Sequence, residues 1–424
     1  MSKVQEMYKT IAADDFPDTI ALEFGDSRIS YRRRSWNIGG EQRGLRYGEN
    51  PDQPAALYEA VEGYPSIDGV RCKGPGQGLV SSLKEEQMLQ AGKHPGKTNL
   101  TDVDNGINIL QYLHARPAAL IIKHNNPCGA AWSGAGIADA LSKAYWSDRI
   151  AAFGGTVVVN RPLNLAAADL ISSSYYEVVA APDFEQGVLA IIKKRKNLRI
   201  LRIPGLAGLE QFSSIPFLDI KSLCDGGLVL QRGFSDRIRS VQDFLPARAE
   251  KDGKVIEART PTPAETEDLL FAWAVESGVS SNSVIFAKDG ATVGIGTGEQ
   301  DRVGCVELTI HKACTKYKDM LVFRECGKSL YEVRKDAAVN DRSAALLADA
   351  EAAAAAARGG LKASVLVSDG FFPFRDGVDL ALEQGVTAIA QPGGSLRDGE
   401  VIAAVNEASP PVAMVFTGQR SFRH

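Results

Sequence analysis

The sequence predicts a layered α/β protein in which strands and helices alternate along most of the chain. Short apolar runs that end in turn residues are typical of buried strands, and longer periodic stretches between them are typical of helices. The alternation is clearest in residues 100–203 and again in residues 263–416. Strands that alternate with helices usually form a sheet covered by helices, and 424 residues suit two or three lobes.

The composition of the chain bounds its class. The chain is 44% apolar and 24% charged, with a net charge of −4 and no long basic run, so we expect no nucleic-acid partner. No stretch is apolar for long enough to cross a membrane, and the N-terminus lacks the apolar core of a signal peptide. The six cysteines are scattered without a CxxC pair, which favours a cytoplasmic protein without zinc.

We divide the chain into four parts. Residues 1–42 form an N-terminal arm, residues 43–215 a first lobe, residues 216–260 a connecting segment rich in turn residues, and residues 261–424 a second lobe. The arm contains two short runs of strand-forming residues on either side of the Gly25-Asp26 turn, which predicts a β-hairpin.

Periodicity predicts the elements of the first lobe. Helices are expected at residues 100–113, 135–145 and 166–173, and strands at residues 118–122, 156–159, 177–182 and 199–203. The run at 118–122 is short, apolar and partly β-branched, which is typical of a buried strand. Pro127 cannot donate to a β-ladder and should end that strand. The small residues from Cys128 to Ala131 are then expected to open a helix.

The second lobe begins with a helix at residues 263–279. Thr262 can cap this helix, Pro263 suits its first position, and Glu265 completes a capping box. A hairpin is expected at residues 284–295. The remaining elements are a helical insertion at about 312–362, strands at 365–367, 388–390 and 411–416, and helices at 378–384 and 399–407.

The pair Lys123-His124 directly follows the strand at residues 118–122. Two ionisable groups at the C-terminal edge of a strand, one of which changes charge near neutral pH, indicate a ligand site, because ligands bind at that edge in α/β sheets. The run from Gly294 to Gly298 ends a hairpin and lacks the GxGxxG spacing, so we reject a dinucleotide-binding loop. A glycine turn that brings the backbone near a ligand stays an alternative.

Other stretches leave a structural and a functional interpretation open. Arg46-Tyr47 lies among turn residues, where an arginine suits a phosphate but an ordered structural loop is the alternative. The pair Gly154-Gly155 indicates that the backbone passes close to a ligand or to another strand. The phenylalanines in residues 371–374 can wall an aromatic slot or pack in the core. The cationic tail at residues 417–424 suggests an anion site.

These stretches resemble the formyltransferase part of the bifunctional purine-biosynthesis enzymes, the AICAR transformylase half of the transformylase/IMP cyclohydrolase family. The resemblance covers roughly residues 43–424, and the motifs occur in the order of the family. They are Leu45-Arg46-Tyr47-Gly48-Glu49-Asn50-Pro51, Lys123-His124-Asn125-Asn126-Pro127-Cys128-Gly129, Ala152-Phe153-Gly154-Gly155, Ser281-Asn282-Ser283, Gly294-Ile295-Gly296-Thr297-Gly298, Asp369-Gly370-Phe371-Phe372-Pro373-Phe374-Arg375-Asp376 and the segment from Phe416 to His424.

The resemblance implies two cytidine-deaminase-like α/β/α lobes without zinc, the second carrying the helical insertion, in a homodimer with shared active sites. It also implies the reaction of a phosphoribosylaminoimidazolecarboxamide formyltransferase. In that reaction the formyl group of 10-formyltetrahydrofolate moves to the 5-amino group of AICAR, which gives FAICAR and tetrahydrofolate.

The resemblance implies roles for individual residues. His124 matches the catalytic histidine of the family and would act as general base towards a weakly nucleophilic amine. Asn282 and Lys123 would stabilise the oxyanion or relay the proton. The residues expected at the substrate are Arg46, Tyr47, Gly154, Glu177, Phe371, Arg420 and His424, with the arginines on the phosphate. A structural potassium ion is expected near Ser283 and Asp369.

The sequence departs from the family pattern at Asp52, where a histidine usually follows Asn-Pro, and at residues 299–302. About 40 residues before the resemblance are too few for a cyclohydrolase domain, so we expect a separate IMP cyclohydrolase to close the ring. The alternatives to the transferase are a zinc-free hydrolase of a purine-like nucleotide, in which His124 activates water, and a non-catalytic nucleotide-binding protein.

Overall fold

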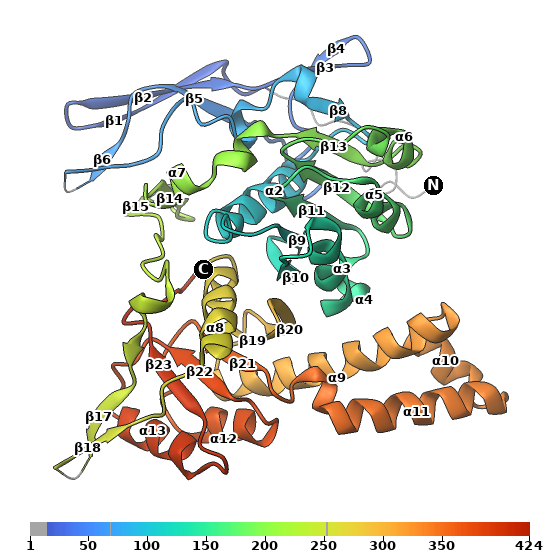
Figure 1. Cartoon of the computed structure of the whole chain (residues 1–424). Helices are drawn as coiled ribbons and strands as arrows, with labels where there is room; N and C mark the ends of the chain where they lie inside the picture. The colour runs from blue at the N-terminus through green and yellow to red at the C-terminus, as the bar shows by residue number, and fades with distance from the viewer. Residues whose placement is uncertain (1–14, 68, 252) are drawn as a thin grey trace. The chain divides into compact units, whose positions relative to one another are not determined.

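The structure is a computed structural model of the chain, and it describes residues 15–67, 69–251 and 253–424. It has the mixed α/β architecture that the sequence predicts (Figure 1). Residues 1–14 of the expected N-terminal arm lie outside the described part. The chain divides into two compact units, of which the first comprises Met1–Asn125, Gly134–Asp139 and Phe153–Asp236, and the second Asn126–Ser133, Ala140–Ala152 and Arg237–His424.

The first unit contains a sheet whose strands alternate with helices along the chain. Its elements are β8 (Met88–Gln90), α2 (Lys97–Leu110), β9 (Ala118–Lys123), β11 (Gly155–Val159), α5 (Leu165–Ser172), β12 (Tyr176–Ala181), α6 (Val188–Ile192) and β13 (Arg199–Arg202). The strand order is β9-β11-β12-β13-β8. The strands β11, β12 and β13 run parallel, whereas β9 and β8 are antiparallel to their neighbours. Helix α2 packs on one face, and α5 and α6 lie on the other (Figure 1).

Burial on both faces explains the composition of these strands. Every side chain at positions 118–122 in β9, 157–159 in β11 and 178–181 in β12 is fully buried. A strand covered on both faces needs apolar side chains on both sides, so its sequence is a continuous apolar run. The buried strand predicted at residues 118–122 is therefore confirmed.

The remaining strands of the first unit form small antiparallel sheets. They are β1 (Thr19–Phe24), β2 (Ser27–Arg33), β3 (Trp36–Ile38), β4 (Glu41–Arg43), β5 (Tyr58–Glu62), β6 (Ser66–Ile67), β7 (Val70–Arg71), β14 (Leu218–Ser222) and β15 (Leu228–Arg232). The predicted hairpin around Gly25-Asp26 is confirmed, because β1 pairs antiparallel with β2 from Thr19 opposite Arg32 to Phe24 opposite Ser27.

The strands of the second unit follow a pattern of parallel and antiparallel pairing similar to that of the first unit. The second unit contains β10 (Asn126–Trp132), α4 (Arg149–Ala152), β16 (Leu245–Pro246), β17 (Arg248–Lys251), β18 (Lys254–Glu257), α8 (Pro263–Glu276), β19 (Val284–Lys288), β20 (Ala291–Gly296), β21 (Val365–Ser368), α12 (Asp376–Glu383), β22 (Ala388–Gln391), α13 (Asp398–Glu407) and β23 (Ala413–Phe416). The strand order is β16-β23-β22-β21-β19-β20-β10. The strands β21, β22 and β23 run parallel, and the β19-β20 hairpin is antiparallel to them through β19. The capping box of α8 is confirmed, since Thr262 and Glu265 each accept a backbone N–H of the other.

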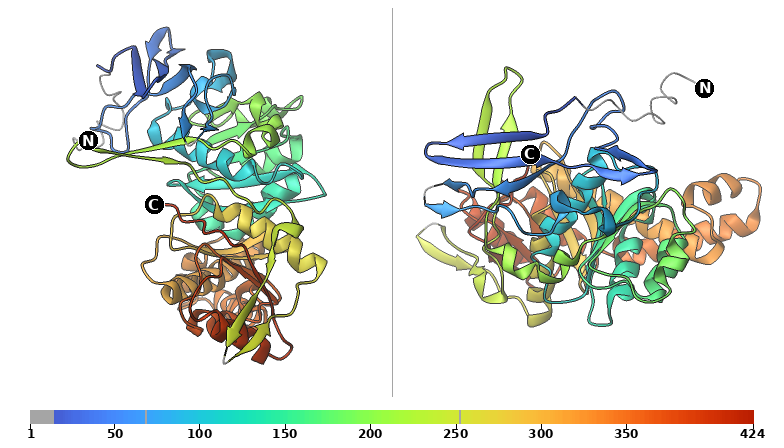
Figure 2. Two further views of the ribbon diagram at one scale, coloured as in Figure 1. Left: turned by 90° about the vertical axis from the view of Figure 1, so that its left-hand side faces the viewer. Right: turned by 90° about the horizontal axis from the view of Figure 1, so that it is seen from above.

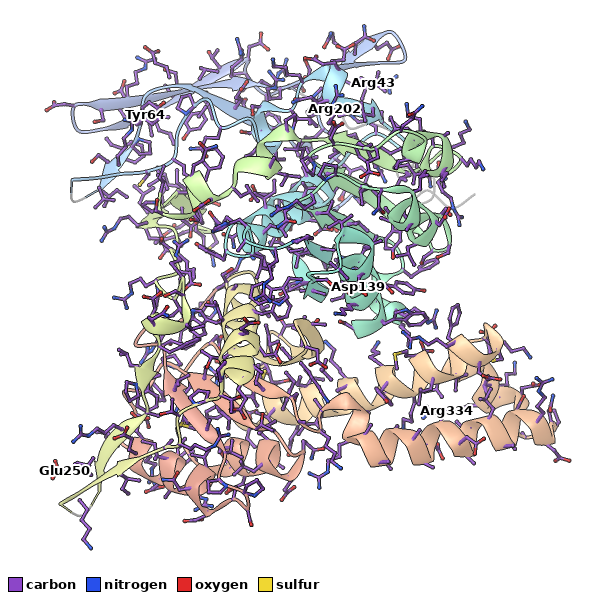
Figure 3. All side chains as sticks on the ribbon, viewed as in Figure 1. Arg43, Tyr64, Asp139, Arg202, Glu250 and Arg334 are labelled. Atoms are coloured by element: carbon purple, nitrogen blue, oxygen red, sulfur yellow. The ribbon has the colours of Figure 1, made fainter. Side chains whose placement is uncertain are left out.

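Three consecutive helices lie in the region of the second unit where the sequence predicts a helical insertion. They are α9 (Arg302–Cys326), α10 (Leu330–Asp336) and α11 (Asp341–Ala357). Figures 1 and 2 show α9 and α11 side by side, around a small core of Val322, Leu330, Val333 and Ala350. Arg334, which is labelled in Figure 3, belongs to α10 and is exposed. Helix α9 begins earlier than predicted, because Asp301 caps it by accepting the N–H of Gly304 at 2.6 Å.

The expectation of a helix from Cys128 is wrong, because residues Asn126–Trp132 form strand β10, antiparallel to β20. The small residues serve close packing instead. A Cβ atom added to Gly129 would lie 1.9 Å from the carbonyl oxygen of Ala144 in α3 (Ile137–Ser147). Ala130 and Ala131 are fully buried. In the described part of the chain, no helix combines the length and the apolar composition needed to cross a membrane.

Candidate active site

The pair Lys123-His124 lies in the turn after β9, in the first unit. Lys123 donates from Nζ to the carbonyl oxygen of Phe153 at 2.7 Å. His124 and Asn125 both have left-handed backbone conformations, with φ of 51° and 61°, and the His124 side chain is exposed. Non-glycine residues keep this conformation only where their surroundings fix it. The turn therefore presents His124 to solvent on a backbone that other groups must hold.

Two side chains of α2 hold this turn. Asp102 accepts the N–H of Asn125 at 2.7 Å, and Asn105 donates to the carbonyl oxygen of Asn125 at 2.8 Å. Asp102 is 5% exposed, and its burial raises its pKa to about 6, partly opposed by the Asn125 N–H and the charge of His124. Asp102 is therefore a buried carboxyl group whose charge acts on His124. The sequence placed it near the start of a helix and indicated nothing more.

Arg46 is nearly buried and has no counter-ion among the residues that the structure describes. Its backbone N–H donates to Pro95 at 3.0 Å, and its guanidinium carbon lies 5.2 Å from the centre of the Tyr47 ring. The side chain is only 8% exposed, yet within the described residues it makes no hydrogen bond or ion pair. None of its nitrogens is among the fully buried unbonded atoms of the described residues, so the guanidinium is held by a mostly buried stem with donors open to a negatively charged ligand.

Arg199 and His94 interact electrostatically with Arg46. Arg199 is 4% exposed, and its pKa is lowered by burial, an effect that Glu177 opposes and the charge of Arg46 increases. Burial also lowers the pKa of His94, with further lowering by the charges of Arg43, Arg199 and Arg46. The group therefore has an excess of positive charge and suits a phosphate.

Glu177 is tied to this cationic group. Its Oε2 accepts from Asn99 Nδ2 at 3.0 Å and lies 3.6 Å from Nη1 of Arg199. The charge of Glu177 also acts on Asp102. Sequence reasoning missed Arg199, although a charged residue at the head of a strand buried on both faces is a usable signal.

Gly154 lies beside the Lys123-His124 turn. Its N–H donates to the carbonyl oxygen of Tyr175 at 2.8 Å, and its φ of 75° is in the region that favours glycine. The preceding residue, Phe153, accepts the hydrogen bond from Lys123. The first unit thus holds six of the predicted site residues: Arg46, Tyr47, Lys123, His124, Gly154 and Glu177.

The remaining predicted site residues lie in the second unit at one edge of its sheet. They are Asn282, Ser283, Asp369, Phe371, Arg420 and His424. Val284, the first residue of β19, pairs with Ser368, the last residue of β21. This register places the Ser281-Asn282-Ser283 turn next to Asp369, and Ser281 Oγ donates to Asp369 Oδ2 at 2.6 Å. The chain after β23 returns to the same edge, where Ser421 N–H donates to the Asp369 carbonyl oxygen at 3.0 Å.

Aromatic and cationic side chains gather beside this edge. The guanidinium carbon of Arg420 lies 5.2 Å from the centre of the Phe371 ring and 5.6 Å from that of Phe422. The ring of His424 lies 6.0 Å from that of Phe422. Phe372 is fully buried in the core of the second unit, so Phe371 is the residue of this pair that reaches the cluster.

The predicted potassium ligands lie beside a buried carboxyl group. Both oxygens of Asp369 are already bonded, one by Arg302 and the other by Ser281. Within the described residues, the Ser283 hydroxyl and both carboxyl oxygens of Glu276 are fully buried and lack hydrogen bonds of normal geometry. Burial, with the charge of Asp369, raises the pKa of Glu276 well above its usual range. These oxygens fit a monovalent cation. No group of three or more His, Cys, Asp or Glu suited to a metal occurs in the described residues.

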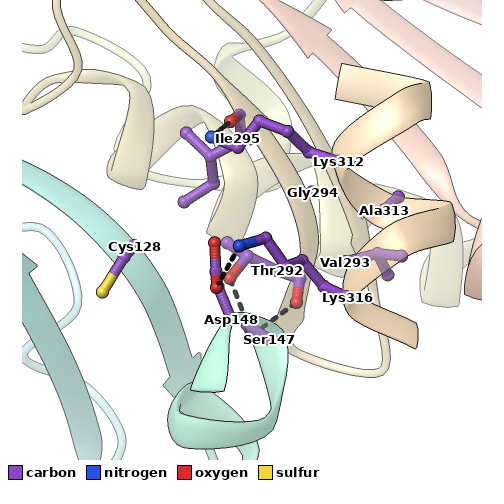
Figure 4. Close-up of a pocket in the computed structure, with 10 residues that line it drawn as sticks. All are labelled: Cys128, Ser147, Asp148, Thr292, Val293, Gly294, Ile295, Lys312, Ala313 and Lys316. Carbon is purple, nitrogen blue, oxygen red and sulfur yellow. Dashed lines mark hydrogen bonds and ion pairs between the residues drawn. The ribbon is translucent and has the colours of Figure 1, made fainter. Parts of the chain in front are cut away.

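A small pocket of the second unit lies apart from the predicted site residues (Figure 4). Its cationic groups are bonded, since Lys312 donates to the Ile295 carbonyl oxygen at 2.5 Å and Lys316 lies 3.0 Å from an Asp148 oxygen. Cys128 is the one lining residue from the Lys123–Gly129 motif. We therefore interpret this pocket as a structural feature and not as a binding site.

Comparison with known proteins identifies relatives of this chain. The family model described as AICARFT/IMPCHase bienzyme matches residues 5–312. The bifunctional purine biosynthesis protein PurH of Cereibacter sphaeroides is 38% identical over 395 residues, which cover 93% of this chain and 61% of that protein. The PurH proteins of Rhodospirillum rubrum and Magnetococcus marinus are 37% and 35% identical, and the matches cover 90% of this chain and 59% of each relative.

The chain spans about three fifths of the length of the curated relatives that it matches. The family model covers well over half of the chain, and the matching relatives are 35% to 38% identical over the aligned residues. The chain therefore belongs to the AICARFT/IMPCHase bienzyme family.

Proposed function

We propose that this chain transfers the formyl group of 10-formyltetrahydrofolate to the 5-amino group of AICAR. The observation that carries the proposal is the state of Arg46, which is nearly buried, makes no hydrogen bond or ion pair through its side chain within the described residues and is acted on by the positive charge of Arg199. The phosphate of a nucleotide supplies the missing negative charge. Because the chain belongs to the AICARFT/IMPCHase bienzyme family, we propose that this nucleotide is AICAR.

In this proposal His124 is the general base. The amine nitrogen of AICAR attacks the formyl carbon, a nitrogen–carbon bond forms, and His124 accepts the proton that the nitrogen loses. The bond between the formyl carbon and N10 of the folate then breaks, and His124 returns the proton to N10. The buried Asp102 carboxylate stabilises the positive imidazolium between these steps, because its charge acts on His124.

The remaining residues bind substrate and stabilise charge. Asn282 donates to the formyl oxygen as it becomes negative, and Lys123 adds positive charge or relays the proton. The sets that hold substrate are Arg46, Tyr47, Gly154 and Glu177 in the first unit, and Phe371, Arg420 and His424 in the second. A potassium ion, when bound, would be held by oxygens of Ser283 and Asp369 and would supply a partner for the buried Ser283 hydroxyl.

Two further features belong to the proposal by family resemblance. The units are cytidine-deaminase-like lobes, a reading supported by the parallel strands β11–β13 and β21–β23, each flanked by an antiparallel strand. The protein acts as a homodimer with shared active sites. Ring closure to IMP is not assigned to this chain.

The test is a direct assay with purified protein, AICAR and 10-formyltetrahydrofolate. We expect FAICAR and tetrahydrofolate in equal amounts. Turnover with formate and ATP alone would leave the nucleotide assignment and remove the folate donor. Release of ammonia or phosphate from AICAR without formyl transfer would favour the hydrolase, and binding without any reaction would favour a non-catalytic protein. His124→Ala should bind AICAR normally and lose turnover, and an unchanged rate would exclude His124 as the base.

A further inference from the structure

We infer that Arg302 is a positioning residue that fixes the side-chain amide of Asn282 with its NH₂ group directed to the reacting oxygen. The inference deepens the proposed function, on which its kinetic part rests. Arg302 is the first residue of α9 and is 9% exposed.

Arg302 makes three hydrogen bonds at the sheet edge. Its Nη2 donates to Asn282 Oδ1 at 2.9 Å, and its Nη1 donates to the Ser283 carbonyl oxygen at 3.0 Å and to Asp369 Oδ1. Asp369 is fully buried, so the ion pair holds the guanidinium firmly in one place. One rigid, planar group therefore bridges the amide side chain, the turn backbone and the buried carboxylate.

This contact determines which way the Asn282 amide faces. A guanidinium has only donors, so the amide atom that touches it must be the oxygen, and a reversed amide would set two donors against each other. The Asn282 Nδ2 then faces away from Arg302 and donates to the Gln300 carbonyl oxygen at 3.1 Å. The NH₂ group has a second hydrogen, which is the one available to a negative oxygen.

Other contacts fix the backbone of Asn282, and Arg302 and the Gln300 carbonyl oxygen together set the orientation of its amide. The backbone N–H of Asn282 donates to the Glu299 carbonyl oxygen at 3.1 Å, and the thiol of Cys305 donates to the Asn282 carbonyl oxygen at 3.3 Å. The guanidinium also needs space, since a Cβ added to Gly370 would lie 2.6 Å from Arg302 Nη2.

The test compares Arg302→Lys and Arg302→Ala with a matched control, Arg149→Ala. Arg149 also pairs with a buried carboxylate, that of Asp319, through two hydrogen bonds at 2.8 and 3.0 Å, and makes no hydrogen bond to Asn282 among the described residues. We expect kcat to fall about 10- to 100-fold in both Arg302 variants, with the KM for AICAR changed less than about threefold. Lysine keeps the charge beside Asp369 but lacks the planar fork, so Arg302→Lys reports on orientation even where Arg302→Ala folds poorly.

A double-mutant cycle then separates positioning from general stability. If Arg302 acts through Asn282, then Arg302→Lys costs activity in the wild type and nothing further in Asn282→Ala. Added guanidinium should restore part of the activity of Arg302→Ala. An unchanged kcat in Arg302→Lys, or full additivity with Asn282→Ala, would overturn the inference.

A readout without substrate keeps the inference distinct from the proposed function. Protein labelled with ¹⁵N-asparagine gives side-chain amide signals, and the Asn282 pair is identified by its absence in Asn282→Ala. We expect this pair to shift or broaden in Arg302→Lys and to stay unchanged in Arg149→Ala. An inactive wild type would refute the formyl transfer alone, whereas an Asn282 signal indifferent to Arg302→Lys would refute the positioning role.

Discussion

Replacing Asp102 by asparagine should change how the stability of the protein depends on pH. Burial raises the pKa of Asp102 from 3.8 to about 6 in the folded protein. The folded state therefore holds this proton more tightly than the unfolded chain does. The stabilising contribution is complete below pH 3.8 and is lost as the pH rises through about 6. The ionised carboxyl group remains a cost to the folded state at neutral pH.

The magnitude follows from the size of the pKa change. At about 1.36 kcal/mol for each pH unit, a rise from 3.8 to about 6 corresponds to about 3 kcal/mol of unfolding free energy. About 2 kcal/mol of this change falls between pH 4.5 and pH 8. Asparagine has nearly the same size and keeps an oxygen for the Asn125 N–H, but it does not ionise. The stability of Asp102→Asn relative to the wild type should therefore increase by about 2 kcal/mol over that range.

Urea unfolding followed by circular dichroism at several pH values between 4.5 and 8 measures this difference. Asp169→Asn is the control, because Asp169 is an exposed aspartate on α5 in the same unit, and its effect should not vary with pH. A relative stability of Asp102→Asn that stays constant within about 0.5 kcal/mol, or that decreases as the pH rises, would refute the account of Asp102 as a buried, proton-retaining carboxyl group.

Three further predictions follow from single contacts. In steady-state assays, Arg46→Met should raise the KM for AICAR about 10- to 100-fold, because a charge-assisted bond is lost. The control is Arg71→Met, which removes an arginine that lies 3.5 Å from the centre of the Tyr64 ring. This control should leave the KM for AICAR unchanged. In thermal unfolding, Gly129→Ala should destabilise the protein by about 3 kcal/mol, because the new Cβ would clash with the Ala144 carbonyl oxygen. The control is Gly134→Ala, where nothing lies within 4 Å of the new Cβ. An equally small effect of both substitutions would contradict this prediction. Burial raises the pKa of Glu276. The stability of Glu276→Gln relative to the wild type should therefore increase as the pH rises, by about 1 kcal/mol or more at pH 8. A relative stability that instead decreases with pH would show that Glu276 is ionised and paired.

The elements that depend on local pattern were predictable from the sequence. The hairpin around Gly25-Asp26 and the capping box of Thr262 and Glu265 occur as expected, because both depend on residues a few positions apart. The helix expected after Pro127 failed for the opposite reason. Small residues permit a helix and a closely packed strand equally well, and the contact of Gly129 with Ala144 decides between them.

The candidate site was predictable only for residues that carry a motif. His124, Arg46 and Asn282 stand in recognisable stretches, whereas Asp102, Arg199 and Arg302 do not. Asp102 holds the backbone of Asn125, and Arg302 holds the amide of Asn282, through bonds between segments distant in sequence. No periodicity encodes such partners, since they arise only when the sheet brings the segments together.

By itself the sequence determined the α/β class, most of the strands and helices, and the family, because each depends on the order of residues along the chain. The tertiary structure alone decided which groups support the chemistry: a carboxyl group behind His124, an arginine at position 46 that bonds no acceptor in the described part of the chain, and a guanidinium that contacts the Asn282 amide. The physical reason is that charge, burial and hydrogen-bond direction depend on distances in space, and those distances exist only after the strands have paired and the helices have packed.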